Sequence, residues 1–581
     1  PMAIIQFLAS KKERIALPAA LVCDHLVQAN AGAIPDLKVA DKNNYETYTF
    51  LRDVSRRYGF DFWPAGAGIC HQIFLENYDF PGGMMLVTDS HTPTACGLGM
   101  LAIGAGGADL CDALMGMEWE LKMPKIIGIK LTGKLKGWAS PKDVILKVAG
   151  ILSTKGGTNC VIEYFGDGCK TLSATGKATI GNMGAEVGAT TTVFPYDDAM
   201  KRYLTATGRA AVAELADGVK KDLPADKEVL AHPEKYYDRV IEINLSQVEP
   251  AINGPMSPDA MMPLSDVAKI AKEKGFPTQL EVALIGSCTN SSYEDITRAA
   301  SVAKQIVEKG IEFKTPLLVV PGSVRIYETL KRDGVLQYFE KLNATVLADA
   351  CGPCIGQWKR TIGDSTKPNA IIESFNRNFA GRNDGSKKTN AFLASPEIVM
   401  AMAIAGDLTF NPLKGTFKAA DGTNYQLKAP KGEELPKKGF VKEVKGCILP
   451  TYEKIENVQV MVVKKDGSRE AFDADKIRRG LIKACEKRPV AMHDVDQLVR
   501  DVETQIYNSL DQEVSSARIG EMVMERLRGL DEVAYVRFAS VYRSFCDINT
   551  FMEELKKLLG KPGAEENEKT ETDPESGSHN I

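Results

Sequence analysis

Two short apolar runs constrain the fold of this chain more than any other feature of its sequence. Residues 281–286 read EVALIG and residues 316–321 read PLLVVP, and each run leads into a polar loop that is followed by a helical pattern. Continuous apolar runs of this length are typical of parallel strands that are buried on both faces. Strands that alternate with helices predict α/β layers, in which ligands bind beyond the carboxyl ends of the strands.

Local patterns elsewhere in the chain also predict strands and helices. Residues 125–132 read KIIGIKLT, whose alternation and β-branched residues predict a strand. Ser140 followed by Pro141 is a usual helix start, and the residues up to Ala149 predict an amphipathic helix. Residues 458–463 predict a further strand in a different unit, with several helices after it. The 581 residues are enough for roughly four domains.

Composition and charge exclude several classes of protein. The net charge of −4 and the pI of about 6.1 give no broad positive field for nucleic acid or an anionic membrane. No apolar run approaches the roughly 18–20 residues that cross a bilayer. The twelve cysteines are scattered rather than spaced as a secreted disulfide framework, which favours a reducing compartment. Pro1 precedes Met2 without a signal-peptide pattern, so we expect an N-terminus that has been trimmed or is incomplete.

Three cysteines form the strongest candidate for a metal site. Cys351 and Cys354 are a Cys-x-x-Cys pair, and Cys288 directly follows the apolar run 281–286. A zinc site would need a fourth ligand at short spacing, and none is present. A [4Fe–4S] cluster held by three thiolates would leave one iron open as a Lewis acid. Spacing alone leaves three buried structural cysteines as an equal alternative.

Histidines and arginines extend this pattern. Three of the six histidines lie in the first ninety or so residues, and two of these have a nearby carboxylate, as in Asp24–His25 and Asp89–His91. Such pairs suit general acid catalysis. Arg377 lies in a loop of Asn and Gly that also holds a second arginine, and guanidinium groups match carboxylates in a bidentate way. Together these residues indicate a site for a small polycarboxylate.

The chain from residue 2 to about 439 resembles the aconitase family, most closely its mitochondrial type. The matching segments read CDHL, HQIFLENY, TDSHTP, GWASPKDVILKVAGIL, GNMGAEVGATT, IGSCTNSSYED, ADACGPCIGQW and NRNFAGRNDG. Isopropylmalate isomerase large subunits share the cysteine pattern but fit the other segments less well. The resemblance implies a three-lobed α/β/α core with parallel sheets.

The resemblance also implies a role for each matched residue. It implies reversible isomerisation of citrate to isocitrate through cis-aconitate by an iron–sulfur hydro-lyase. The implied cluster ligands are Cys288, Cys351 and Cys354. Asp24 and His25 would protonate the departing hydroxyl. The supporting pairs around the cluster would be formed by His71, Asp89, His91 and Glu186. The implied substrate and cluster neighbours are Ser90, Asn182, Asn376, Arg377 and Arg382.

One part of the family pattern has no counterpart in this sequence. Aconitases carry a swivel domain after a long linker, and it supplies a serine base in a Ser-Ser-Arg context together with a substrate arginine. The nearest string here is Ser515-Ser516-Ala517-Arg518, within a different module. We therefore expect the isolated chain to lack the base unless a separate swivel subunit supplies it.

The C-terminal part resembles the ATP-cone domain of the bacterial ribonucleotide reductase repressor. The matching segments read YEKIENV, VVKKDGSREAFD, KIRRGL, ACEKRPV and LDEVAYVRFASVYRSF. The resemblance implies a small α+β domain that binds ATP or dATP and that can mediate oligomers. The candidate phosphate contacts are Lys464, Lys465, Arg469, Lys476, Arg479, Lys487 and Arg488. Only Cys447 lies where that repressor has a four-cysteine zinc ribbon, so DNA binding is not expected.

These observations predict six segments and leave two functions open. The segments are 1–124, 125–243 and 244–440 for the three lobes, 441–456 for a linker, 457–559 for the ATP-cone domain and 560–581 for a disordered tail. The preferred function is the hydro-lyase described above. The alternative is an ATP- or dATP-sensing regulatory protein whose aconitase portion is inactive, and the junction itself fits either a natural fusion or a misassembled reading frame. We expect a cytoplasmic protein, with a mitochondrial one as the alternative.

Overall fold

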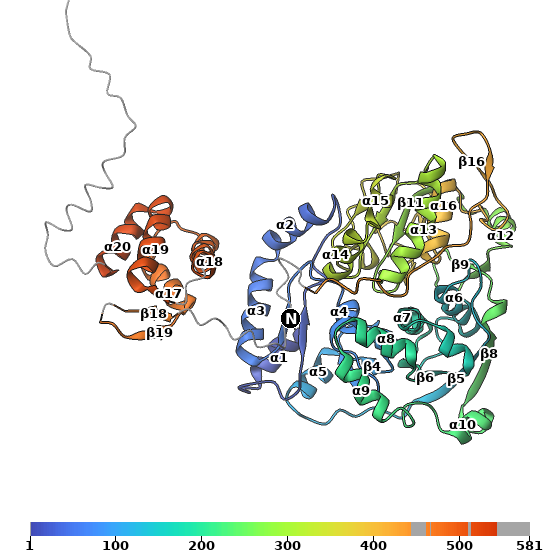
Figure 1. Cartoon of the computed structure of the whole chain (residues 1–581), viewed down its shortest axis with the longest axis horizontal. Helices are drawn as coiled ribbons and strands as arrows, with labels where there is room; N and C mark the ends of the chain where they lie inside the picture. Colours follow the sequence, from blue (N-terminus) through green and yellow to red (C-terminus); the bar gives the residue numbers. More distant parts are fainter. Residues whose placement is uncertain (1, 443–460, 465, 509–512, 543–581) are drawn as a thin grey trace, which may run out of the picture. The chain divides into compact units, whose positions relative to one another are not determined.

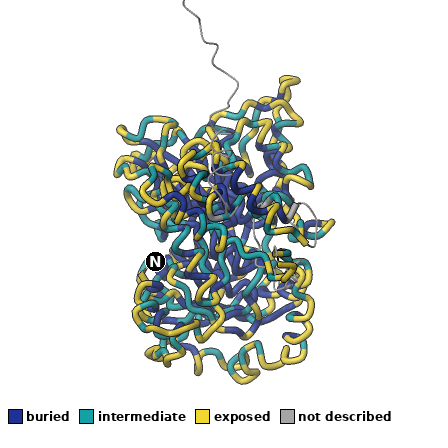
Figure 2. The backbone as a smooth tube through the Cα atoms, turned by 90° about the vertical axis from the view of Figure 1, so that its left-hand side faces the viewer, coloured by how far each residue is buried: buried dark blue, intermediate teal, exposed yellow. Residues whose placement is uncertain are grey.

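The computed structural model describes residues 2–442, 461–464, 466–508 and 513–542 of the chain. The chain divides into two compact units, Pro1–Pro450 and Thr451–Ile581 (Figure 1). Buried residues, dark blue in Figure 2, run through the interior of the first unit, whose exposed residues lie mostly in loops and on outer helix faces. Among the described residues, every helix is either too short or too polar to cross a membrane.

The first lobe surrounds two small parallel sheets, in which β1 pairs with β2 and β3 pairs with β4. The apolar faces of its helices bury Phe7, Leu51 and Phe60 in one cluster beside these strands. Its elements are α1 Met2–Ala9, β1 Ala20–Val22, α2 Ala33–Asn43, α3 Tyr45–Tyr58, β2 Asp61–Trp63, α4 Cys70–Asn77, β3 Met84–Val87, η1 Thr92–Leu98, β4 Leu101–Gly104 and α5 Gly107–Leu114.

The second lobe is a four-stranded parallel sheet in the order β7-β6-β5-β8. Its β5 spans the predicted strand 125–132. The elements are β5 Lys125–Thr132, α6 Pro141–Leu152, β6 Cys160–Phe165, η2 Asp167–Thr171, α7 Ala174–Asn182, η3 Met183–Val187, β7 Thr191–Val193, α8 Asp198–Ala206, α9 Ala210–Gly218, α10 Lys227–Ala231, α11 Pro233–Tyr236, β8 Arg239–Asn244 and η4 Leu245–Gln247.

Helix α6 begins where Ser140 and Pro141 predict, but it is not simply amphipathic. The Ser140 hydroxyl and Asp143 form a capping box at its start. Lys142 and Asp143 are nevertheless fully buried, beside Val144 and Ile145. The helix is enclosed on nearly all sides because neighbouring elements cover the face that its polar residues present.

The third lobe contains a seven-stranded sheet in the order β10-β9-β15-β14-β11-β12-β13, parallel from β15 to β13. The predicted strands 281–286 and 316–321 are its adjacent β11 and β12. The elements are β9 Ala251–Asn253, β10 Met261–Pro263, α12 Val267–Lys274, β11 Leu280–Ile285, α13 Tyr293–Lys309, β12 Leu317–Val319, α14 Val324–Arg332, α15 Leu336–Glu340, β13 Thr345–Val346, η5 Gly352–Ile355, β14 Asn369–Glu373, β15 Thr389–Leu393, α16 Pro396–Ala405, β16 Phe417–Lys418 and β17 Asn424–Tyr425.

Alternation along β11 divides the side chains of this sheet between two cores. Ala283 and Ile285 join the large cluster that also contains residues of α13 and α16. Val282 and Leu284 join a separate cluster that includes Cys351 and Cys354. Since successive side chains of a strand point to opposite faces, the sheet has helices on one face and the cysteine loops on the other.

The second unit is a small α+β fold. Its sheet has the order β19-β18-β20, antiparallel at the first pair and parallel at the second. Four helices bury a core around Leu481, Val502 and Leu527. The elements are β18 Met461–Val463, β19 Arg469–Ala471, α17 Ala474–Ala484, α18 Met492–Asn508, β20 Glu513–Ser515, α19 Ser516–Leu530 and α20 Glu532–Tyr542. The start of the predicted strand at 458–460, most of the predicted linker and the whole predicted tail lie outside the described residues.

Candidate active site

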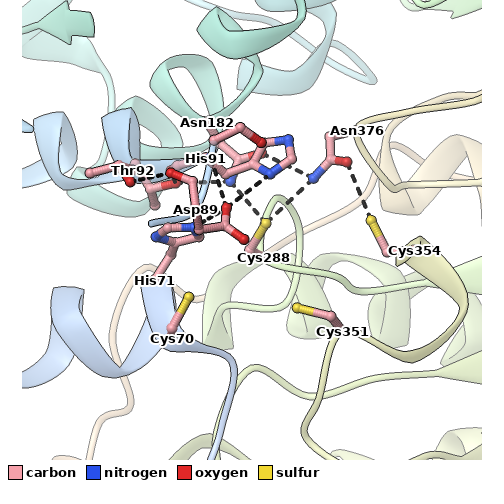
Figure 3. Close-up of polar contacts among 12 residues, drawn as sticks. Cys70, His71, Asp89, His91, Thr92, Asn182, Cys288, Cys351, Cys354 and Asn376 are labelled. Carbon is pink, nitrogen blue, oxygen red and sulfur yellow. Dashed lines mark hydrogen bonds and ion pairs between the residues drawn. The ribbon is translucent and has the colours of Figure 1, made fainter. Parts of the chain in front are cut away.

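The predicted site residues of the first unit lie close together, although they come from distant parts of the chain. Figure 3 shows the three cysteines with the side chains of His71, Asp89, His91, Asn182 and Asn376. Most of them directly follow the carboxyl ends of parallel strands. Asp24 follows β1, Asp89 follows β3, Cys288 follows β11 and Asn376 follows β14. The others lie at the start of α4, at the end of α7, in η3, in the loop that contains η5 and in the connection between β14 and β15. This is the strand-end location that the α/β pattern predicts.

A tight turn places Cys288 at the end of β11. Gly286 has φ +135°, and a Cβ atom there would lie 2.5 Å from the carbonyl oxygen of Val320. Ser287 has φ +59°, which is uncommon for a residue with a side chain. The Sγ of Cys288 accepts hydrogen bonds from Asn182 Nδ2 at 3.1 Å and from Asn376 Nδ2 at 3.4 Å. Two amide donors therefore face this sulfur, an arrangement that stabilises negative charge on it.

The Cys-x-x-Cys pair lies in the loop that contains η5. The backbone N–H of Cys354 donates to the carbonyl of Cys351 at 3.0 Å, which keeps the two residues in one turn. Cys354 Sγ lies 3.3 Å from Asn376 Oδ1, and Cys351 Sγ lies 3.5 Å from Asp24 Oδ2.

These three thiols fit an iron–sulfur cluster by their chemistry. All three are free and none is bound in a disulfide. Burial raises the pKa of Cys354 to about 11 and raises those of Cys288 and Cys351 further, so without a metal they are neutral thiols. A metal that binds such thiols releases their protons. Thiolates in one pocket, with amide hydrogen bonds to a sulfur, are the donor set that iron–sulfur clusters use.

Asp89 is the centre of the histidine network. Its Oδ1 is 2.8 Å from His71 Nε2, and its Oδ2 is 3.2 Å from His25 Nε2. His25 Nδ1 is also 2.8 Å from Asp24 Oδ1, so the predicted Asp24–His25 pair is a side-chain contact. His91 contacts Asp89 mainly through its backbone N–H, at 2.8 Å, while its ring Nδ1 is 3.5 Å away. One carboxylate thus orients three histidines.

The carboxylates favour protonated imidazole in this network. Hydrogen bonds that the His25 ring donates to Asp24 and Asp89 raise the pKa of His25 to about 10, despite partial burial. Burial lowers the pKa of His91, but hydrogen bonds to Asp89 and to Glu186, the latter at 2.9 Å, outweigh it and raise the pKa overall. Burial opposes ionisation of Asp89, yet the neighbouring His71 and His25 lower its pKa overall. The network therefore favours the protonated form of His25 at neutral pH.

Arg377 lies beside the histidine network. Its Nε donates to Glu186 Oε1 at 2.7 Å, and its terminal nitrogen donates to Ser90 Oγ at 2.8 Å. Arg382 instead donates through Nε to the carbonyl of Cys354 at 2.7 Å, which ties its loop to the cysteine loop. Both guanidinium groups keep further N–H groups for a carboxylate ligand.

Sequence reasoning missed two buried residues of the pocket. Lys142 Nζ donates to the carbonyls of Ser374 and Phe375, at 2.8 and 2.6 Å, and so holds the backbone just before Asn376. A lysine within a helical pattern reads as a surface residue, so no signal marked it. Cys70 lies at the start of α4, next to His71, and is nearly fully buried. The Gly-Ile-Cys-His segment contains it, but a lone cysteine has no diagnostic spacing.

The second unit places most of its candidate phosphate contacts in ion pairs. Lys464 and Lys476 both contact Glu470 at 2.8 Å. Further ion pairs join Arg469 to Glu513, Arg479 to Asp473 and Arg488 to Asp531. Lys487 is exposed at a left-handed backbone position, and Lys465 lies outside the described residues. Exposed pairs of this kind contribute little stability, so a polyphosphate could replace their carboxylates at small cost.

The serine string 515–518 has a structural role in this unit. Ser515 Oγ accepts the backbone N–H of Arg518 at 3.1 Å and thereby caps the start of α19. This contact accounts for the string without any catalytic function.

Comparison with known proteins agrees with the pocket. The model of the aconitase family (aconitate hydratase) matches residues 8–406, and that of the ATP cone domain matches residues 460–548. A mitochondrial aconitate hydratase of Gracilaria gracilis is 54% identical over 439 residues, which cover 76% of this chain and 56% of the relative. Two proteins of Saccharomyces cerevisiae cover the same shares: a mitochondrial aconitate hydratase, 52% identical over 440 residues, and a mitochondrial homocitrate dehydratase, 51% identical over 444. The chain spans about half the length of these curated relatives.

Proposed function

The chain belongs to the aconitase family, and we propose that its first unit is the cluster-binding part of an iron–sulfur hydro-lyase. The reaction is the interconversion of citrate and isocitrate through cis-aconitate. Cys288, Cys351 and Cys354 would hold a [4Fe–4S] cluster. The observation that carries the proposal is the convergence of three free thiols, two buried and one half-buried, with a histidine network centred on Asp89.

Side chains of the site donate the proton and bind the substrate carboxylates. When bound, the cluster supplies a Lewis acid that polarises the hydroxyl to be lost. His25, which Asp24 and Asp89 keep protonated, gives that hydroxyl a proton as it leaves. Ser90 and Arg377 bind a substrate carboxylate, and Arg382 binds a second. Pairing with a guanidinium stabilises the negative charge that develops on a carboxylate when the neighbouring carbon loses its proton.

Substrate and partner follow from the same site. The pocket suits a small hydroxy-tricarboxylate, and the homocitrate dehydratase among the relatives makes homocitrate the second substrate to test. We expect a swivel subunit to supply the serine that removes the carbon-bound proton.

The names of the relatives favour the mitochondrial alternative over the cytoplasm that we expected first. Fractionation of the source cells with an antibody to the chain decides between the two compartments.

Anaerobic cluster reconstitution tests this function. The parent chain should bind close to four irons and turn brown, and with a swivel subunit it should consume cis-aconitate, followed by ultraviolet absorbance. Cys351→Ser should prevent assembly of the full cluster. Cys160→Ser, which changes an equally buried cysteine on β6, is the matched control and should leave iron content unchanged. An iron content in Cys351→Ser equal to that of the parent chain would refute the assignment.

We also propose that the second unit binds ATP or dATP, supported by the ATP cone match at residues 460–548. Phosphate would replace Glu470 beside Lys464 and Lys476. Calorimetric titration with ATP should show weaker binding for Lys476→Met, by roughly tenfold, since one charge-assisted contact contributes about 1.5 kcal/mol. Arg500→Met, an exposed change on α18, is the control and should bind like the parent chain. Equal affinity for all three proteins would contradict these contacts.

A further inference from the structure

One threonine hydroxyl joins the two side-chain amides that face the Cys288 sulfur. Thr289 follows Cys288 in the turn after β11 and is 3% exposed. Its Oγ1 donates a hydrogen bond to Asn182 Oδ1 at 2.7 Å and accepts one from Asn376 Nδ2 at 3.0 Å. Because Asn182 and Asn376 are both fully buried, these bonds form away from water.

The donors around this hydroxyl determine where its own proton points. Ser287 Oγ also donates to Thr289 Oγ1, at 3.3 Å. A hydroxyl has one proton and two lone pairs. Since two donors already point at its oxygen, Thr289 gives its proton to Asn182, and the oxygen of that amide must face the hydroxyl. The amide nitrogen then faces Cys288 Sγ at 3.1 Å and Thr94 Oγ1 at 2.8 Å.

Two further threonines support this orientation. Thr94 Oγ1 donates to the carbonyl of His91 at 2.6 Å, so its oxygen is left to accept from Asn182. Thr179, on the same helix α7 as Asn182, donates through Oγ1 to the carbonyl of Thr289 at 2.9 Å. A continuous series of hydrogen bonds therefore joins the first lobe, through the second, to the turn of the third.

The orientation of the Asn376 amide depends most on this hydroxyl. Its Nδ2 lies 3.4 Å from Cys288 Sγ, and its Oδ1 lies 3.3 Å from Cys354 Sγ (Figure 3). A half-turn of the amide would exchange its two ends and direct the oxygen at Cys288. The Cys354 thiol opposes this half-turn by donating to Oδ1, but a metal-bound thiolate has no proton to donate. The Thr289 oxygen still opposes it, because its proton is already given to Asn182.

We propose that Thr289 is a positioning residue for the cluster, which keeps the amide nitrogens of Asn182 and Asn376 directed at the Cys288 sulfur. The inference rests on the proposed function, since it concerns a ligand of the proposed cluster. Hydrogen bonds to the sulfurs help to set the reduction potential of an iron–sulfur cluster. They stabilise the more negative, reduced state, so their loss should lower the potential.

Removal of the hydroxyl from the full-length chain tests this role. The parent chain, Thr289→Val, Thr289→Ala and Thr289→Ser are reconstituted anaerobically with iron and sulfide. A redox titration then follows the reduced cluster by electron paramagnetic resonance. We expect a lower midpoint potential in the valine and alanine variants, and a potential close to that of the parent chain in the serine variant, which keeps the hydroxyl.

The rate of iron loss to an excess of EDTA is the second measurement. The valine and alanine variants should lose iron roughly tenfold faster than the parent chain, because the hydrogen-bond partners of a metal ligand change metal binding by tenfold or more. Thr191→Val is the matched control. It removes an equally buried hydroxyl on β7, which donates to the carbonyl of Ala102, and it should behave as the parent chain.

The possible results separate this role from the proposed cluster. Parent-like potentials and rates of iron loss in the valine and alanine variants overturn the role of Thr289 and leave the cluster intact. A serine variant that behaves like the valine variant, or a Thr191→Val control that shows the same changes, also overturns it, because the hydroxyl at position 289 is then not the cause. Failure of the parent chain to assemble any cluster overturns the proposed function as well. If the valine variant does not fold, the alanine variant decides the result.

Discussion

Substitution of Lys142 should change the free energy of unfolding by an amount that depends on pH. The side chain is fully buried, and burial lowers its pKa from the ordinary 10.5 to about 8. This difference corresponds to about 3 kcal/mol of free energy that the charged form costs the folded state. Its two hydrogen bonds, to the carbonyls of Ser374 and Phe375, offset that cost, since a buried carbonyl without a partner costs about 1–3 kcal/mol.

The variant Lys142→Met removes both effects at once. At pH 7 the lost hydrogen bonds and the relief of the buried charge largely cancel, so the variant should be destabilised by no more than about 3 kcal/mol. Above pH 8 the folded parent chain has already lost the proton that the unfolded chain still binds. Its stability therefore rises with pH from about 8 to 10.5 relative to the variant. The difference in unfolding free energy between the two should grow by about 3 kcal/mol across this window.

Urea unfolding of the metal-free chain at a series of pH values from 7 to 10.5 measures this difference. Subtracting variant from parent cancels groups that titrate equally in both. Glu373 is the exception, because burial raises its pKa to about 8 and it interacts with Lys142, so the pair is repeated in a Glu373→Gln background. Lys147→Met, a half-buried position on the same helix, controls for loss of a helical lysine. A parent–variant difference that is independent of pH would refute the buried charge.

Three further predictions concern the same unit. Arg360→Met should destabilise it by about 3–5 kcal/mol in urea unfolding, because the buried Asp384 carboxylate, 2.9 Å from the guanidinium, and the partly buried Glu281 carboxylate, 2.5 Å from it, lose their partner; a change under 1 kcal/mol would contradict this. Gly286→Ala should cost roughly 3 kcal/mol or more and lower iron content after reconstitution, since the new Cβ meets the Val320 carbonyl; parent-like iron binding would show that the turn can relax. Removal of iron by a chelator should lower the melting temperature of the first unit alone, because a ligand stabilises only the fold that binds it; calorimetry that shows an equal shift in both transitions would contradict a site confined to the first unit.

Strand-based reasoning located the pocket well but could not assign its contacts. The apolar run before Cys288 predicts a strand end, which is where an α/β sheet holds its ligands. Asp89 follows β3 of a different sheet, so its approach to Cys288 depends on tertiary packing. The spacing of Asp89 and His91 suggested a direct pair. The ring of His91 instead has its shortest contact with Glu186, 95 residues away. Such a partner is chosen by tertiary packing, which leaves no local pattern in the sequence.

Burial and pairing of polar residues are the second feature that the sequence could not predict. Lys142 has no neighbours in sequence that mark it as part of a site, and its role depends on the backbone after β14, which belongs to another lobe. In the second unit the sequence predicted a row of cations, but it could not show that Lys476 and Arg469 already contact carboxylates. Charge patterns in sequence report which groups are present, whereas the structure reports which of them are engaged.

The spread of the site along the chain sets a time at which it can first be completed. Its residues run from Asp24 to Arg382, a span of about 350 residues. At roughly 5–20 residues per second, a ribosome needs about 20–70 seconds to make that span. During this interval Asp24 and His25 have been synthesised, but the cysteines that they face do not yet exist. If the proposed cluster is correct, iron and sulfide can be delivered only after the loop that contains Arg382 has been made, and the unfilled thiols must stay reduced until then.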